Sequence, residues 1–233
     1  MPVFQIMGNH DNCFMSATRP VEGRTIRDIN LNIQRMFEEA FGPINYSFNR
    51  GDAHIVGMRN VQWKSGDDCA TDNTATRFTE DPYRWLVEDL SCVDNKEQKV
   101  VILCVHIPLY NNGTLGDGSY RQEVLSLLGE FGEAHILSGH LHYQRNYDHT
   151  LIGKSTHKIY EHAQAAINGA SWSSNINGDG VPNGYGVYHI FNGTIKDWYY
   201  KGYAQGMDSR EYQMRLYRGN AITGAAIEGA NKN

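Results

Sequence analysis

Apolar residues follow two different periods in the first part of the chain, and each period predicts one kind of element. Between Thr25 and Ala40 they recur at helical spacing, and Gly42-Pro43 should end that helix because both residues favour positions just past a C-terminus. Gln98 to Val105 is a near-continuous apolar run, which is typical of a strand covered on both faces. Strands are predicted at 3–7 and 134–137, and a hairpin at 46–58. Helices are predicted from 79 or 81 to 90, and from a cap at Ser119 over a segment that buries residues up to Phe131. The polar stretch 64–79 is predicted to be a loop.

The later part of the chain is mostly β in character. Strands are predicted at 158–162, 186–191, 195–201 and 213–217, and Asn192-Gly193 is a strong signal for a two-residue hairpin turn. Because strands and helices alternate before this part, we predict an α/β layered domain. We place that domain at residues 1–203, and we expect 204–233 to be a linker or the opening of a second domain.

The net charge of the chain limits the classes of binding partner that are expected. A formal net charge of −5 argues against a nucleic-acid backbone partner, which requires a basic surface. It does not argue against a phosphate substrate, because bound cations can dominate the field inside a site. No apolar run approaches membrane-spanning length. The compartment stays open: it is periplasmic or exported if the full-length protein carries a signal peptide, and cytoplasmic otherwise.

Polar clusters follow three of the predicted strands. These are Gly8-Asn9-His10-Asp11, the isolated His106, and Gly139-His140-Leu141-His142. Ligands of open α/β sheets bind at the carboxyl ends of the strands, and Asn and His side chains suit divalent metals. His140 and His142 alternate across a strand end or a turn, and a period of two should point their rings to opposite sides. The alternative for any single histidine is a core residue that bonds to the backbone.

In this order, the motifs resemble those of the calcineurin-like metallophosphoesterases. In that family a G-N-H-[D/E] block, an isolated histidine and a G-H-x-H block are the later three of five metal-site blocks. The earlier D-x-H and G-D-x-x-D blocks are not seen ahead of Gly8, so we expect the later portion of such a domain. The resemblance implies a layered β-sandwich flanked by helices, incomplete at its N-terminus. Segments such as His106-Ile107-Pro108-Leu109-Tyr110 further resemble exported or periplasmic-type bacterial members.

The resemblance also implies a metal centre. The complete family site holds two divalent ions, for which Mn, Fe and Zn are all compatible. Matched position by position, Asn9, His106 and His140 would bind one ion and His142 the other. The aspartate that bridges both ions belongs to an earlier block, so we expect one ion or none in this chain, and slow hydrolysis.

Two further residues carry implied catalytic roles. His10 resembles the family histidine that contacts the phosphoryl oxygen and protonates the leaving group, a task that suits an imidazole near neutral pH. Asp11 would orient His10, and its alternative role is that of a helix N-cap or turn residue.

Four residues close to the ligand-bearing segments are candidates for the substrate pocket: Tyr110, Asn111, Arg145 and Trp172. Core packing is the alternative for the two aromatic residues, and a structural ion pair is the alternative for Arg145.

The predicted function is hydrolysis of small phosphate mono- or diesters by a metal-activated water. The alternative is a non-catalytic module that binds a metal or an anion. Because the leading strands of the family domain are not seen, we expect exposed strand edges and apolar helix faces. The chain should therefore self-associate or pair with a complementary N-terminal fragment.

Overall fold

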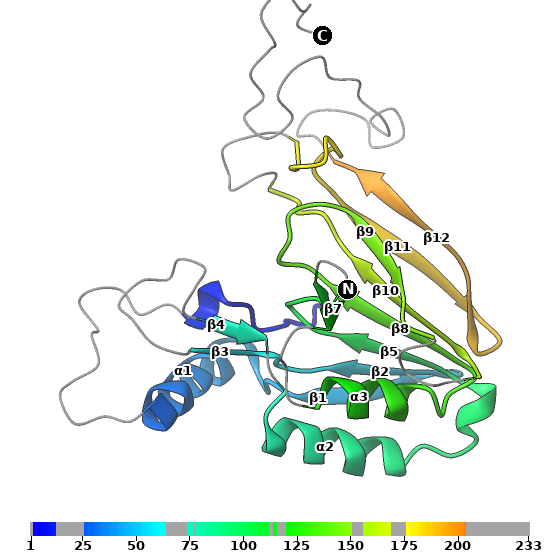
Figure 1. Ribbon diagram of the computed structural model, residues 1–233, viewed down its shortest axis with the longest axis horizontal. Helices are drawn as coiled ribbons and strands as arrows, with labels where there is room; N and C mark the ends of the chain where they lie inside the picture. The colour runs from blue at the N-terminus through cyan, green and yellow to red at the C-terminus, as the bar shows by residue number, and fades with distance from the viewer. Residues whose placement is uncertain are drawn as a thin grey trace, which may run out of the picture.

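The protein is built around a six-stranded mixed sheet in the order β1-β2-β5-β8-β10-β9 (Figure 1). The computed structural model describes residues 2–12, 26–63, 74–76, 78–111, 114–115, 120–150, 156–168 and 176–203. Four central strands run parallel, and an antiparallel strand is added at each edge. The strands are β1 (Tyr46–Arg50), β2 (Ala53–Gly57), β5 (Val100–Cys104), β8 (Glu133–Ser138), β9 (Arg145–Asp148) and β10 (Lys158–Ala163).

Side chains of β5 alternate between two apolar layers. Val101 and Leu103 belong to the core that the helices α2 (Glu80–Ser91) and α3 (Arg121–Leu128) cover. Val100 and Ile102 belong to a second cluster on the opposite face, which Ile195 contacts. The prediction of a strand covered on both faces is therefore confirmed, and its apolar run is explained by burial on both sides.

The second layer is a hairpin formed by β11 (Gly184–Phe191) and β12 (Thr194–Gly202). It lies on the side of the sheet away from α2 and α3 (Figure 1). Asn192 and Gly193 connect the two strands with φ of 50° and 69°. Positive φ at both central residues is what a type I′ turn requires, so the predicted hairpin turn is confirmed. The fold is therefore α/β, with a mixed sheet flanked by helices.

Helix α1 (Ile26–Phe41) joins the start of the chain to the ligand-bearing end of the sheet. It ends as predicted, because Gly42 has a φ of 95° and its N–H donates to Glu38 O at 3.0 Å. Its apolar face shares a separate core cluster that consists of Met7, Ile33, Phe37, Ile44, Val61 and Ile107. Helix α1 thus helps to hold the segment before Gly8 against the loop that carries His106.

Several elements differ from the predicted pattern. Residues 3–7 form no strand within the described part of the chain; Val3 and Phe4 are exposed and only Met7 is fully buried. The expected loop at 64–79 contains β4 (Thr74–Thr76), which pairs with β3 (Val61–Trp63). The remaining short elements are η1 (His10–Asn12), η4 (Lys96–Gln98), β6 (Tyr110–Asn111) and β7 (Thr114–Leu115).

Other expectations concern residues outside the described ranges. Ser119 is one of them, and Tyr120, with a φ of 65°, stands at the N-cap position of α3. The predicted strand at 213–217 and the segment 204–233 also lie outside the described residues. Among the helices that the structure describes, none is long and apolar enough to span a bilayer.

Candidate metal centre

Two histidines are brought side by side by adjacent parallel strands. His106 follows the end of β5 by two residues, and His140 follows the end of β8 by two residues. Backbone bonds continue past the strand ends: Val105 N–H donates to Leu137 O at 3.0 Å, and Gly139 N–H donates to His106 O at 2.9 Å. The β5–β8 pairing therefore fixes the separation of the two histidines.

Asn9 completes a group of three potential ligands. Its Oδ1 lies 2.7 Å from His106 Nε2 and 3.3 Å from His140 Nδ1. The two ring nitrogens lie 3.3 Å apart, and the rings meet edge to face with centroids 5.1 Å apart. The structure thus brings together three of the four residues that the sequence motifs suggested as metal ligands.

The residues flanking Asn9 shape this approach. A Cβ at Gly8 would lie 3.0 Å from His106 Cε1 and 3.1 Å from Nδ1, so glycine is what allows the ring to pack against this segment. The N–H of Gly8 donates to Asp11 Oδ2 at 2.6 Å. Asp11 therefore acts as a turn residue, the second of the two roles considered for it; its role toward His10 stays a prediction.

The G-H-x-H segment forms a tight turn and not the end of a strand. His140 and His142 have φ of 66° and 54°, a left-handed conformation that is uncommon for residues with a side chain. Of the two settings considered for this pair, a strand end or a turn, the structure has the turn, because β8 ends at Ser138 and the backbone is left-handed at His140 and His142. His142 O accepts a hydrogen bond from Gly178 N–H at 3.1 Å, which ties the turn to the segment before β11. Left-handed backbone at non-glycine residues is often found at functional sites.

Four imidazoles share one electrostatic neighbourhood. Burial lowers the pKa of His106 to about 3, and repulsion from His140, His10 and His142 adds to that effect. The pKa values of His140 and His142 are lowered by the same causes, burial first and then the neighbouring imidazoles. The side chains of His106, His140 and His142 are therefore neutral at pH 7. A neutral imidazole presents the lone pair that a metal ion requires.

The donor set fits one cation. For ligands about 2.1 Å from an ion at angles between about 90° and 110°, the donor atoms should lie about 3.0–3.4 Å apart. Two of the three separations are 3.3 Å, and the third, 2.7 Å, requires a small opening. Nitrogen and amide oxygen donors suit Mn, Fe or Zn. In the part of the chain that the structure describes, no group of three or more His, Cys, Asp or Glu side chains could hold a metal ion, and the triad includes an amide, Asn9, beside its two histidines.

The residues suggested for the substrate pocket have mixed placements. The ring of Tyr110 packs against Tyr147 with centroids 4.3 Å apart, in line with core packing. Arg145 is exposed, and its guanidinium lies 5.4 Å from the centre of the Tyr147 ring in a cation–π contact. Trp172 and the side chain of Asn111 lie outside the described residues.

Comparison with known proteins assigns the chain to a family. Residues 1–144 match the family model described as "Calcineurin-like phosphoesterase", which covers more than half of the chain. The chain belongs to the calcineurin-like phosphoesterase family. Residues 161–232 match a second model, "C terminal of Calcineurin-like phosphoesterase", which begins within β10 and includes the β11–β12 hairpin.

This phosphoesterase-family chain is also similar to a plant protein. It is 30% identical over 144 residues to Purple acid phosphatase 22 of Arabidopsis thaliana. The match covers 59% of this chain and 30% of the plant protein's length. The chain therefore corresponds to less than a third of that relative.

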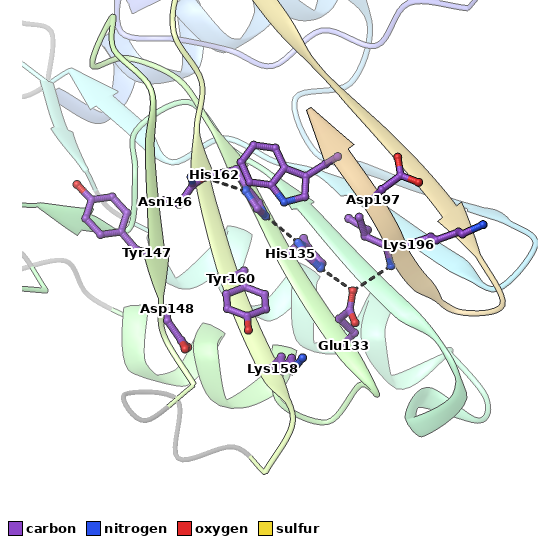
Figure 2. A pocket seen from close by; sticks show the side chains of 12 residues that line it. Glu133, His135, Asn146, Tyr147, Asp148, Lys158, Tyr160, His162, Lys196 and Asp197 are labelled. Carbon is purple, nitrogen blue, oxygen red and sulfur yellow. Dashed lines mark hydrogen bonds and ion pairs between the residues drawn. The ribbon is translucent and has the colours of Figure 1, made fainter. Parts of the chain in front are cut away.

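A second polar cluster in this phosphoesterase-family chain was not predicted from the sequence. Figure 2 shows His135 between His162 and Glu133, with hydrogen bonds of 2.8 and 2.7 Å. Glu133 in turn accepts bonds from Thr194 Oγ and Ile195 N–H, which attach the β11–β12 hairpin to the sheet. The residues line a cavity of about 660 Å³ to which none of the four motif residues contributes. The one sequence signal for this cluster is that Glu133 and His135 are two residues apart in β8, a spacing that puts both side chains on the same face of the strand.

Proposed function

We propose that this chain takes part in the metal-dependent hydrolysis of phosphate mono- or diesters, with Asn9, His106 and His140 as ligands of one divalent cation. The convergence of their three donor atoms, within 2.7–3.3 Å of one another, is the observation that carries the proposal. When bound, such a cation offsets charge on phosphoryl oxygens and lowers the pKa of water. Phosphoryl transfer otherwise asks mainly for positioning and charge stabilisation.

His10 is proposed as the proton donor to the leaving oxygen. It is exposed on the turn η1, directly after the ligand Asn9, and repulsion from it helps to lower the pKa values of the three other imidazoles of the cluster. A side chain beside the ligands yet open to solvent can reach a substrate that the cation holds. Asp11 supports this role indirectly, because its bond to Gly8 N–H stabilises the turn that presents His10.

The substrate is proposed to be a small phosphoester. Tyr110 and Arg145, together with Asn111 and Trp172, are the candidates for its contacts beyond the phosphoryl group. Arg145 is the strongest of these, because its guanidinium is exposed and suits a phosphate oxygen. The net charge of −5 supports a small substrate over a nucleic-acid backbone.

A second candidate function is a non-catalytic module that binds one metal or anion. It is favoured by the donor set, in which Asn9, His106 and His140 form one group of three and His142 is the sole proposed ligand of a second ion. A catalytic centre with two ions then needs donors from a complementary segment or a second chain, which we propose as a partner.

Both proposals can be tested with metal titration and hydrolysis in parallel. Calorimetry with Mn²⁺ and Zn²⁺ should detect binding to the wild-type chain and none to His140→Ala. His189→Ala is the matched control, because His189 is an exposed histidine of β11 bonded to Asp197 and should leave binding unchanged. Hydrolysis of nitrophenyl phosphate and of its diester with Mn²⁺ should depend on His140 in the same way.

The outcomes separate the two functions. Metal binding with His140-dependent hydrolysis supports the phosphoesterase, and metal binding without hydrolysis supports the binding module. Equal metal binding by wild type and His140→Ala contradicts both, because it places the cation elsewhere.

A further inference from the structure

Glu161 is a fully buried carboxylate in β10 that accepts four hydrogen bonds. Its Oε1 accepts from Leu109 N–H at 2.8 Å and from Ser138 Oγ at 3.0 Å. Its Oε2 accepts from Tyr110 N–H at 3.2 Å and lies 2.8 Å from Nε2 of the fully buried His149. A buried carboxylate is costly unless several donors satisfy it, and here both oxygens are shared between donors.

These donors belong to both ligand-bearing segments of the proposed metal centre. Leu109 and Tyr110 end the loop that begins at His106, and Ser138 is the last residue of β8, two positions before His140. One side chain from a third strand therefore connects the two segments that carry the imidazole ligands. Backbone N–H groups only donate, so Glu161 must act as an acceptor at both oxygens.

The start of the His106 loop is held by an equally buried residue, Asn60. Asn60 Oδ1 accepts from His106 N–H at 3.2 Å and from Ile107 N–H at 3.1 Å. Its Nδ2 donates to Ile107 O at 2.6 Å. The His106 loop is thus fixed at its start by Asn60 and at its end by Glu161, and of these two side chains Glu161 is the one that also reaches the β8 end.

We propose that Glu161 is a positioning residue of the metal centre, which sets the separation between His106 and His140 by binding both of their segments. This inference rests on the proposed function. In this proposal the affinity for the cation is controlled in part by Glu161, a residue that lies outside the sequence motifs. His149 has a supporting part, because its bond to Oε2 orients the carboxylate toward the loop.

The test compares two carboxylates of the same sheet. Glu161→Gln keeps the size of the side chain but places an NH2 group against donors. Glu133→Gln is the matched control, since Glu133 also accepts bonds from a backbone N–H, a hydroxyl and an imidazole but attaches the β11–β12 hairpin. Ser138→Ala is a milder variant that removes one of the four contacts and keeps the carboxylate.

Two measurements report on positioning. Mn²⁺ or Zn²⁺ titration should show an affinity about 10- to 100-fold lower for Glu161→Gln, the usual effect of removing a partner behind metal ligands. Ser138→Ala should change the affinity less, and Glu133→Gln should lower thermal stability while leaving affinity unchanged. In metal-free protein, the ring-nitrogen resonances of His106 and His140 should shift in Glu161→Gln and not in Glu133→Gln.

Each outcome decides one claim. If the wild type binds a cation and Glu161→Gln binds it equally well, the positioning role is overturned and the proposed function stands. If the wild type binds no divalent cation, the proposed function fails, and the ring resonances alone decide the positioning role. Resonances that stay in place in Glu161→Gln, or that move equally in both glutamine variants, overturn it.

Discussion

The N–H of Gly139 donates to the carbonyl of His106 at 2.9 Å, so the loops that carry His106 and His140 are joined at their backbones. A displacement of one loop is therefore transmitted to the other. The geometry of the proposed metal centre is then a property of the β5–β8 pair as a whole, and it should respond to changes that touch only one loop.

Gly8→Ala should weaken metal binding by displacing the His106 ring. The added Cβ would lie 3.0–3.3 Å from three ring atoms, so the imidazole must shift by a few tenths of an ångström, which changes its position relative to Asn9. We expect an affinity about ten-fold lower, the lower end of the range for a disturbed ligand. Calorimetric titration with Zn²⁺ measures it.

Gly139→Ala is the control for this change. A Cβ there would meet only His106 O, at an ordinary 3.9 Å, so affinity should stay near that of the wild type. Equal losses in the two variants would show that loss of glycine itself, and not contact with the ring, is responsible.

His162 should make the folded state less stable as the pH falls. Burial, and then the neighbouring His135, lower the pKa of His162 to about 4, whereas an unfolded histidine titrates near 6.5. Between these values the unfolded chain binds more protons, so the free energy of unfolding should fall with decreasing pH by up to about 1.4 kcal/mol per pH unit. Above pH 6.5 His162 should contribute no pH dependence.

Urea unfolding of wild type and His162→Gln between pH 4.5 and 7.5 measures this contribution, because glutamine does not titrate. The other ionisable groups of the same cavity are common to both proteins: Glu133, His135, Asp148, Lys158, Tyr160, Tyr147, Lys196 and Asp197. The variant should show the flatter pH dependence. Parallel curves would mean that His162 does not carry the shift.

Gly193→Ala should destabilise the β11–β12 hairpin. Gly193 has a φ of 69°, and a Cβ there would lie 2.2 Å from the backbone oxygen of Gln98. We expect a loss of about 1–3 kcal/mol in the free energy of unfolding, as for other strained backbone positions. Thermal and urea unfolding measure it, and Asn192→Gly, which accepts the neighbouring φ of 50° without strain, should cost far less.

The chain should self-associate through its exposed apolar residues. Val3 and Phe4 are 73% and 53% exposed, and Phe4 stacks on Phe48 of the edge strand β1 with ring centroids 4.5 Å apart. Apolar side chains beside an open sheet edge favour association. Sedimentation at several concentrations should show oligomers, and the double change Val3→Ser and Phe4→Ser should reduce them. A monomer at all concentrations would refute the prediction.

Elements with strong local signals were predictable from the sequence. Helix α1 was predicted by its apolar spacing and by Gly42, and the β11–β12 turn by Asn192-Gly193. Strand β5 was predicted because burial on both faces leaves a continuous apolar run. In each case the physical cause lies within a few residues of the element.

Elements that depend on distant partners were not predictable in this way. Strand β9, Arg145–Asp148, has a polar sequence and exists because it pairs with β10. Residues 3–7 have the apolar content of a strand, yet in the described part of the chain they form no bridge to any strand, although Phe4 stacks on Phe48 of the edge strand β1. A strand is stable only with a neighbour that completes its hydrogen bonds.

Some features of the candidate site were also predictable from the sequence, and others were not. Convergence of His106 and His140 followed from their positions after parallel strands, whose carboxyl ends meet at one edge. Asn9 joins them from a segment that forms no strand, so its place there came from the motif resemblance and not from a strand end. The left-handed backbone at His140 and His142 was not predicted, because that conformation at histidine has no sequence signal. Glu161 was missed because its donors come from segments 12 to 52 residues away in the sequence.

Asn9 meets His106 and His140 across 97 and 131 residues of chain. The chain loses conformational entropy when it closes loops of that length, and it does so before the contacts between the loop ends can stabilise it. The three donors should therefore assemble late in folding. Partly folded intermediates should therefore have no affinity for the cation. Metal added during refolding would then stabilise the finished molecule by mass action and leave the earlier steps, and their rates, untouched.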